Sequence, residues 1–138
     1  MPQCLKKPNC MKYKYNTPEE AIISLETAYT AKDLEAVIAS KDFGAEAKII
    51  LESKSYEITD DLIIEVAKLL ELSLTKSLSD NGYPNFKAAR REFSKLDKLK
   101  DNIYFIEERI FYPDNTCHIN EIFLSNKDGL WKVAMVKE

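Results

Sequence analysis

The sequence TPEEAIISLETAYTAKDLEAVIASKDF, residues 17–43, carries the clearest structural signals of the chain. Thr17 can cap a helix, and Pro18 suits the first helical position because its missing N–H would be unpaired there anyway. Asp33 and Asp42 offer caps for two further helices. The stretch therefore predicts consecutive helices that face a core. The apolar residues that repeat at helical spacing in the first of them are Ala21, Ile22, Leu25, Ala28 and Tyr29.

The composition is that of a compact, single-domain protein. The chain has 138 residues, of which 45% are hydrophobic and three are glycines, so one core is expected. The net charge of −3, from 20 basic and 23 acidic side chains, argues against general nucleic-acid binding. No apolar run approaches the roughly 18 residues of a membrane span, and the N-terminal residues lack the apolar segment of a secretory signal. We therefore expect a cytoplasmic protein that binds neither nucleic acid nor membrane.

The first 16 residues differ in character from the rest of the chain. They are polar and irregular and contain two prolines, so we interpret residues 1–16 as a disordered or loosely attached tail and residues 17–138 as the domain. Cys4, Cys10 and Cys117 form no C-x-x-C pair, which favours free thiols. Together with His118 they lack the spacing of a zinc site. The sequence predicts neither a metal nor a cofactor.

Three further helices are expected after this stretch. Residues 43–51 keep one apolar face, and residues 60–78 carry two neighbouring apolar stripes, a width that implies burial on more than one side. The second of these helices ends where Gly82 and Pro84 prevent continuation. Residues 85–100 are predicted as a helix with its aromatic side chains inward and a basic, solvated face outward. The outward residues include Arg90, Arg91 and Lys95.

From Asn102 the apolar pattern alternates, which predicts strands at 103–112, 117–125 and 130–136. The intervening breaks, at 113–116 and 126–129, are read as four-residue hairpin loops. The sequence thus predicts an α+β fold, with N-terminal helices packed on a C-terminal antiparallel β-sheet.

The hairpin loops also assign each strand residue to a face of the sheet. If both loops close symmetrically, Tyr112 pairs with Cys117 and Ser125 with Leu130. We expect the helices to cover the face that carries Trp131, because its apolar residues are the bulkier set. The polar end of that face could line the mouth of a pocket or form a surface ion pair beside a solvated histidine. The pocket candidates are Glu107, Arg109, His118, Asn120 and Trp131.

The opposite face is also largely apolar in this register, so we expect a second chain to bury it, with a homodimer as the default. Glu108 and Glu121 would lie opposite each other there. Paired carboxylates can perform acid–base chemistry, but the nearby Lys132 favours a salt-bridge cluster. The apolar residues expected in this interface are Ile106, Ile110, Ile119 and Phe123.

Three segments together resemble the nuclear-transport-factor-2-like superfamily: the opening TPEEA, the run AYTAKDLEA at residues 28–36, and the ending DGLWKV at residues 128–133. The resemblance implies that the helices pack into the concave side of a strongly curved sheet to form a cone, often with a pocket. It also implies an outer sheet face that commonly meets a second chain. The superfamily includes isomerases, dehydratases, binding modules and bacterial immunity proteins.

Catalytic signals are weak in this sequence. It has one histidine, no glycine-rich phosphate loop and no G-x-S-x-G motif. The resemblance implies an inward aspartate in catalytic members, whereas the inward candidates here are Glu107, Arg109 and His118. We therefore expect a non-catalytic protein, most similar to the immunity proteins that neutralise a toxin by binding it. The alternative is a small-ligand-binding protein or an isomerase or dehydratase-like enzyme. The exposed partner-binding candidates are Tyr83, Arg90, Arg91 and Lys95.

Overall fold

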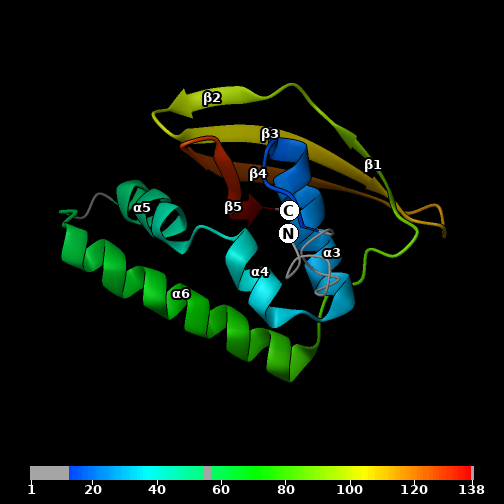
Figure 1. Cartoon of the computed structure of the whole chain (residues 1–138), viewed down its shortest axis with the longest axis horizontal. Helices are drawn as coiled ribbons and strands as arrows, with labels where there is room; N and C mark the ends of the chain where they lie inside the picture. Colours follow the sequence, from blue (N-terminus) through cyan, green and yellow to red (C-terminus); the bar gives the residue numbers. More distant parts are fainter. Residues whose placement is uncertain (1–12, 55–56, 138) are drawn as a thin grey trace, which may run out of the picture.

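The structure is a computed structural model, and it describes residues 13–54 and 57–137 (Figure 1). Within these ranges four helices precede five strands, so the predicted α+β class is confirmed. The helices are α3 (Pro18–Ala31), α4 (Leu34–Ser40), α5 (Phe43–Ser53) and α6 (Asp60–Asn81). The strands are β1 (Arg90–Phe93), β2 (Asp97–Lys100), β3 (Ile103–Phe111), β4 (Cys117–Lys127) and β5 (Leu130–Lys137).

The helices begin at the predicted caps. The Thr17 hydroxyl accepts a hydrogen bond from the Glu20 N–H at 3.1 Å, which satisfies one of the unpaired donors of the first turn of α3. Asp33 and Asp42 do the same for α4 and α5. Helix α6 ends before Gly82, whose φ of +85° is a conformation that glycine adopts without strain. Local capping chemistry therefore sets the helical boundaries.

The predicted helix at residues 85–100 is wrong, because this segment forms β1 and β2. Both strands pair antiparallel with β3 and lie one after the other along the same edge of it. Helix-forming residues such as Ala89, Lys95 and Lys98 made the local sequence misleading. Pairing satisfies the backbone groups along the edge of β3, and this non-local gain overrides local propensity.

Both hairpins pair in registers other than the predicted ones, and the size of the shift differs between them. Phe111, rather than Tyr112, pairs with Cys117, so β3 is shifted by one residue against β4. Lys127 pairs with Leu130 around a two-residue turn, a shift of two against the prediction. Because side chains alternate with period two, a shift of one moves every side chain of β3 to the other face, whereas a shift of two keeps the faces of β4 and β5 next to the turn. A β-bulge between Phe123 and Leu124 then changes the face of the end of β5, so that Val136 pairs with Ile122 and lines the same cavity as Val133.

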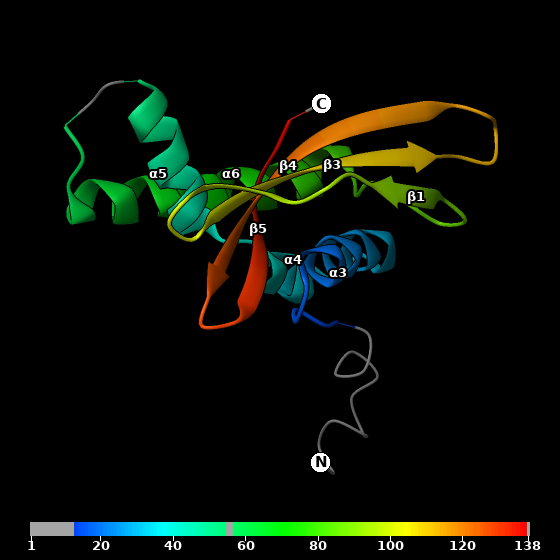
Figure 2. The same ribbon diagram turned by 90° about the horizontal axis from the view of Figure 1, so that it is seen from above.

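The core lies between α3 and the inner face of the sheet. Ile106, Ile122 and Val133 of the sheet belong to the same buried cluster as Ile22 and Leu25 of α3. The view from above shows that the sheet is strongly twisted and that α3 and α4 lie between β1 and the hairpin of β4 and β5 (Figure 2). Helix α3 therefore covers the face that carries Trp131, as predicted for the helices, but β3 contributes the opposite set of side chains to it.

Helix α5 packs on the other face of the same sheet, at one end. Its Ala45 clusters with Ile103 and Ala134, and Ile49 and Phe123 pack against this cluster. The chain reaches this face by passing the edge of β5, where Lys41 forms a parallel bridge with Val133. At this end the sheet is thus covered on both sides by the chain itself.

Asp42 holds the segment that passes the edge of β5 in place. Its carboxylate caps α5, accepts a hydrogen bond from the Ser125 hydroxyl at 2.6 Å and lies 3.2 Å from the Lys127 ammonium. Burial would raise the pKa of Asp42, but the hydrogen bonds from Ser125 and Ala45 and the charge of Lys127 together lower it below 3.8. An ionised Asp42 therefore joins α5 to the β4–β5 hairpin.

Part of the predicted N-terminal tail packs against the domain. Tyr13 and Tyr15 lie against the core, and the Tyr15 carbonyl accepts a hydrogen bond from the Trp131 N–H at 2.9 Å. The Ser24 hydroxyl exchanges hydrogen bonds with both backbone groups of Lys14. The domain therefore includes residues 13–16, while residues 1–12, with Cys4 and Cys10, lie outside the described part.

Candidate functional site

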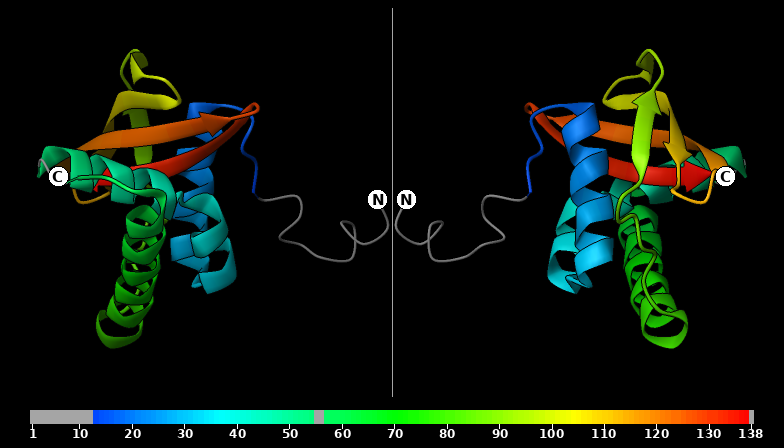
Figure 3. Two further views of the ribbon diagram at one scale, coloured as in Figure 1. Left: turned by 90° about the vertical axis from the view of Figure 1, so that its left-hand side faces the viewer. Right: turned by 90° about the vertical axis from the view of Figure 1, so that its right-hand side faces the viewer.

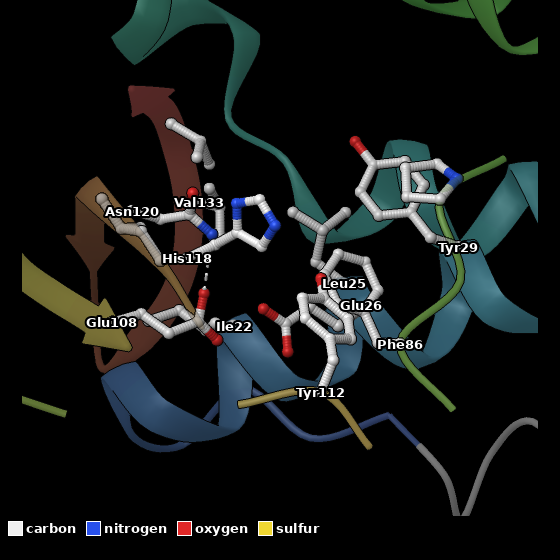
Figure 4. A pocket seen from close by; sticks show the side chains of 13 residues that line it. Ile22, Leu25, Glu26, Tyr29, Phe86, Glu108, Tyr112, His118, Asn120 and Val133 are labelled. Atoms are coloured by element: carbon white, nitrogen blue, oxygen red, sulfur yellow. Dashed lines mark hydrogen bonds between the residues drawn. The ribbon is translucent and has the colours of Figure 1, made fainter. Parts of the chain in front are cut away.

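A cavity of about 310 Å³ lies between α3 and the inner face of the sheet (Figure 4). Its apolar wall comes from α3, β4, β5 and the segment that leads from α6 to β1. Its polar groups come chiefly from α3, β3 and β4, so the chain brings them together from distant positions. The polar residues are Glu26, Tyr29, Glu108, Tyr112, His118 and Asn120.

Two carboxyl groups meet at the wall of this cavity. Glu26 of α3 is 5% exposed and Glu108 of β3 is fully buried, and their carboxyl groups point toward each other (Figure 4). Such burial is unusual for acidic side chains and calls for compensating partners.

Arg91 and Asn120 supply those partners. The Arg91 Nε–H donates to Oε1 of Glu26 and lies 3.7 Å from Oε2 of Glu108. The Asn120 amide donates to Oε1 of Glu108 at 3.3 Å. One guanidinium therefore faces two carboxyl groups, which leaves one negative charge without a cation if both ionise.

A proton shared by the Glu26 and Glu108 carboxyl groups removes the excess negative charge. Burial raises the pKa of Glu26 to about 9, as do a hydrogen bond to Glu108 and the charge of Glu108, against the lowering effect of Arg91. Oε2 of Glu108 is buried and has no hydrogen-bond donor among the described residues unless Glu26 carries that proton. A protonated Glu26 therefore completes the hydrogen bonding and makes the three-residue cluster electrically neutral at pH 7.

Two tyrosines and a histidine line the same cavity. The rings of Tyr112 and His118 pack edge to face with centroids 5.5 Å apart. Burial raises the pKa of Tyr29 to about 12, with a smaller contribution from the charge of Glu46. The Tyr29 hydroxyl therefore stays protonated throughout the neutral range.

The predicted pocket candidates separate into two groups. His118 and Asn120 line the cavity, and Trp131 lies on the same face, where its ring packs against Tyr104 with centroids 4.8 Å apart. Glu107 and Arg109 lie on the outer face as a surface ion pair with an N–O distance of 3.5 Å and side chains 34% and 55% exposed. Their inward placement was wrong because the first hairpin is shifted by one residue.

The partner-binding candidates also separate. Ile106 and Ile110 are buried inside the sheet, Phe123 is half-buried beside α5, and Ile119 is 48% exposed. The predicted outer apolar patch is therefore much smaller than expected, and the predicted pairing of Glu108 with Glu121 is replaced by Glu108 with Asn120. Of the other candidates, Arg90 and Lys95 are exposed, Tyr83 is half-buried against the core and Arg91 lies in the carboxyl cluster.

The prediction from sequence missed Glu26 and Arg91, although a signal for Glu26 was present. Glu26 follows Ile22 by four residues and precedes Tyr29 by three, which places it on the apolar stripe of α3. An acid at such a position indicates a buried partner. Arg91 had no comparable signal, because its inward direction depends on β1 being a strand.

Comparisons with known proteins show a likeness in fold. The chain is similar to a crystal structure of a Campylobacter jejuni protein provisionally named an NTF2-like transpeptidase, with a TM-score of 0.48 and 15% identity over 86% of this chain and 98% of that one. No family model matches the chain, and no curated protein matches it in sequence.

None of the helices in residues 13–54 and 57–137 combines the length and hydropathy needed to cross a membrane. In the same residues no three histidine, cysteine or acidic side chains are grouped so that they could hold a metal ion.

Proposed function

We propose that the protein binds a small, mostly apolar molecule in this cavity and that the Glu26–Glu108 pair exchanges protons with it. The observation that carries the proposal is the pair of buried carboxyl groups, Glu26 and Glu108, at the wall of a 310 Å³ cavity. Buried carboxyl groups with displaced pKa values are typical of acid–base sites. The proposal places the protein with proton-transfer enzymes such as isomerases and dehydratases.

The pair supplies one acid and one base. Glu26 keeps its proton at neutral pH and can donate it to a carbonyl or hydroxyl oxygen of the ligand. Glu108, held by Arg91 and Asn120, can accept a proton from a ligand carbon. If Glu26 gives one proton while Glu108 takes one, the pair keeps its proton number and Arg91 continues to balance its charge.

Blocking the cavity tests the binding step. Val136 lines the cavity and is 41% exposed, so Val136→Trp should fill the mouth without disturbing the core. We expect a fragment screen by thermal shift to find ligands that stabilise the wild type and lose their effect in Val136→Trp. Ile119→Trp is the matched control, because Ile119 is similarly exposed on the opposite face.

Proton exchange tests the chemistry. For a ketone found in the screen, NMR should show incorporation of solvent deuterium beside the carbonyl, at least tenfold slower in Glu26→Gln and in Glu108→Gln. Ligands that bind Val136→Trp as well as the wild type would contradict the site. Exchange at the uncatalysed rate in the wild type would leave a binding protein without the proposed chemistry.

A second candidate function is the neutralisation of a toxin by a cytoplasmic immunity protein that performs no catalysis. The observation that favours it is an exposed rim at one end of the sheet, where the Arg90 guanidinium stacks over the Phe111 ring at 4.3 Å. Ile119 lies exposed on the neighbouring strand. Arginine and aromatic side chains of this kind often dominate protein–protein binding energies.

The two candidates predict opposite behaviour of the same variants. Co-expression with the product of the neighbouring gene should reveal protection from toxicity if the immunity function holds. Arg90→Glu combined with Ile119→Asp should then abolish protection, while Glu26→Gln should retain it. A complex that forms equally well with the double variant would exclude this rim as the binding surface.

A further inference from the structure

Helix α6 exposes a row of large apolar side chains that neither candidate function uses. The helix has 22 residues, and its core contacts come mainly from Leu74 and Leu78. Leu69 and Leu72 are 59% and 65% exposed, and Ile64 is 53% exposed. Exposure of this extent on one helix marks an interaction surface.

The position of α6 leaves this surface accessible. The helix lies at the edge of the molecule remote from the sheet (Figure 1) and extends away from the sheet beside α3 and α4 (Figure 3). A groove of about 480 Å³ between α5 and α6, lined by Phe43, Ile64 and Leu72 among others, continues the apolar surface on one side. No residue of α6 lines the cavity of the carboxyl pair.

Four of the exposed residues of α6 are arranged symmetrically along the helix. Glu65, Leu69, Leu72 and Lys76 follow one another at spacings of four, three and four, so they form a single stripe. If the stripe is read backwards, each leucine meets a leucine and the acid meets the base. The centre of this symmetry lies between residues 70 and 71.

We propose that α6 binds α6 of a second copy of this chain, antiparallel, about a two-fold axis at this centre. Leu69 of each copy then contacts Leu72 of the other, and Glu65 faces Lys76 in two equivalent ion pairs. Lys76 also pairs with Asp80 of its own helix at 2.9 Å, and because both side chains are exposed this pair is weak enough to be shared with Glu65. A two-fold interface requires this kind of self-complementary surface. A partner of different sequence would not require the reversed symmetry, and this decides for a second copy.

The proposed contact between the two α6 helices covers only a few turns, so the dimer should be weak. From Glu65 to Lys76 the helix rises roughly 16 Å, and helices that cross at about 20–50° diverge beyond their central turns. This divergence separates Asp61 from Asp80 of the second copy, which would otherwise repel. The interface is therefore of the small, weakly associating class, with a dissociation constant in the micromolar range.

Sedimentation equilibrium of the full chain between about 10 μM and 1 mM tests the proposal. We expect a monomer–dimer equilibrium in the wild type, which Leu69→Asp combined with Leu72→Asp shifts by more than a hundredfold toward monomer with an unchanged circular dichroism spectrum. Glu65→Lys and Lys76→Glu should each weaken the dimer roughly tenfold. The double charge reversal should restore it to within about threefold.

The double charge reversal distinguishes this interface from non-specific hydrophobic association, since both single charge variants leave Leu69 and Leu72 in place. Lys95→Glu, the same charge change on a remote loop, should leave the equilibrium unchanged. A wild type that stays monomeric at 1 mM would overturn the proposal. So would a dimer that survives the leucine substitutions, or a double reversal that remains as weak as the single ones.

Discussion

Replacing Arg91 with methionine is expected to lower the free energy of unfolding by about 3 kcal/mol at pH 7. The substitution keeps most of the packing volume but removes the cation that faces Glu26 and Glu108. One carboxylate is then buried without a partner of opposite charge. This loss of stability lies at the lower end of the range for removing one partner of a buried ion pair, because the Arg91 side chain is itself 19% exposed.

Urea denaturation measures this loss, and Arg90→Met is the matched control. Arg90 is the neighbouring residue, but its side chain is 65% exposed and pairs with Glu92 at the surface, so we expect a loss below about 1 kcal/mol. The deficit of Arg91→Met should shrink as the pH falls, because protonation of the one carboxylate left without its cation removes the unpaired buried charge. A deficit that stays constant with pH would show that Arg91 acts through packing alone.

The protonation of Glu26 predicts an unusual pH dependence of stability. A pKa of about 9 in the folded protein exceeds the ordinary 4.5, so the folded state retains a proton that the unfolded chain releases. The free energy of unfolding should therefore fall as the pH rises from about 4.5 to about 9 and then level off. This is opposite to the usual carboxylate, such as Asp42, which stabilises the fold above its pKa.

Glu26→Gln should abolish most of this slope. The glutamine amide can donate to Glu108 and its oxygen can accept from Arg91, so it imitates the protonated acid at every pH. Melting temperatures from pH 5.5 to 9 should fall by several degrees in the wild type and stay nearly constant in the variant. Below pH 9, Tyr13 and Tyr29, with pKa values raised to about 12, do not contribute. Parallel curves for both proteins would refute a protonated Glu26.

Signals carried by neighbouring residues were readable from the sequence. Thr17, Asp33 and Asp42 cap the helices as predicted because a cap needs only the residues of the next turn. The Asp128–Gly129 pair forms a two-residue turn with both residues at positive φ, a combination typical of tight hairpins. The loop predicted from the sequence had four residues and contained this pair, so the predicted pairing of β4 with β5 was wrong by two residues. A shift of two leaves the side chains next to the turn on their predicted faces.

The candidate site depended on details that the sequence leaves open. The loop before β4 holds five residues rather than four, with Asn115 at a φ of +69°, and this single residue exchanges Glu107 for Glu108 on the inner face. Arg91 reaches the carboxyl pair only because β1 pairs with a strand more than ten residues away. Both depend on pairing between distant segments, which local patterns do not specify.

The position of the last strand has a consequence for how the chain folds during synthesis. Strand β5 packs against α3, donates a hydrogen bond from the Trp131 N–H to the Tyr15 carbonyl and accepts one from the Asp42 N–H at the Val133 carbonyl. The first elements of the domain to be made therefore contact its last strand. The core cannot close while the C-terminal residues are still inside the ribosome. Until then the apolar stripe of α3 remains uncovered, and a chain in this state is prone to aggregate. Closure of the domain is thus delayed until β5 has left the ribosome.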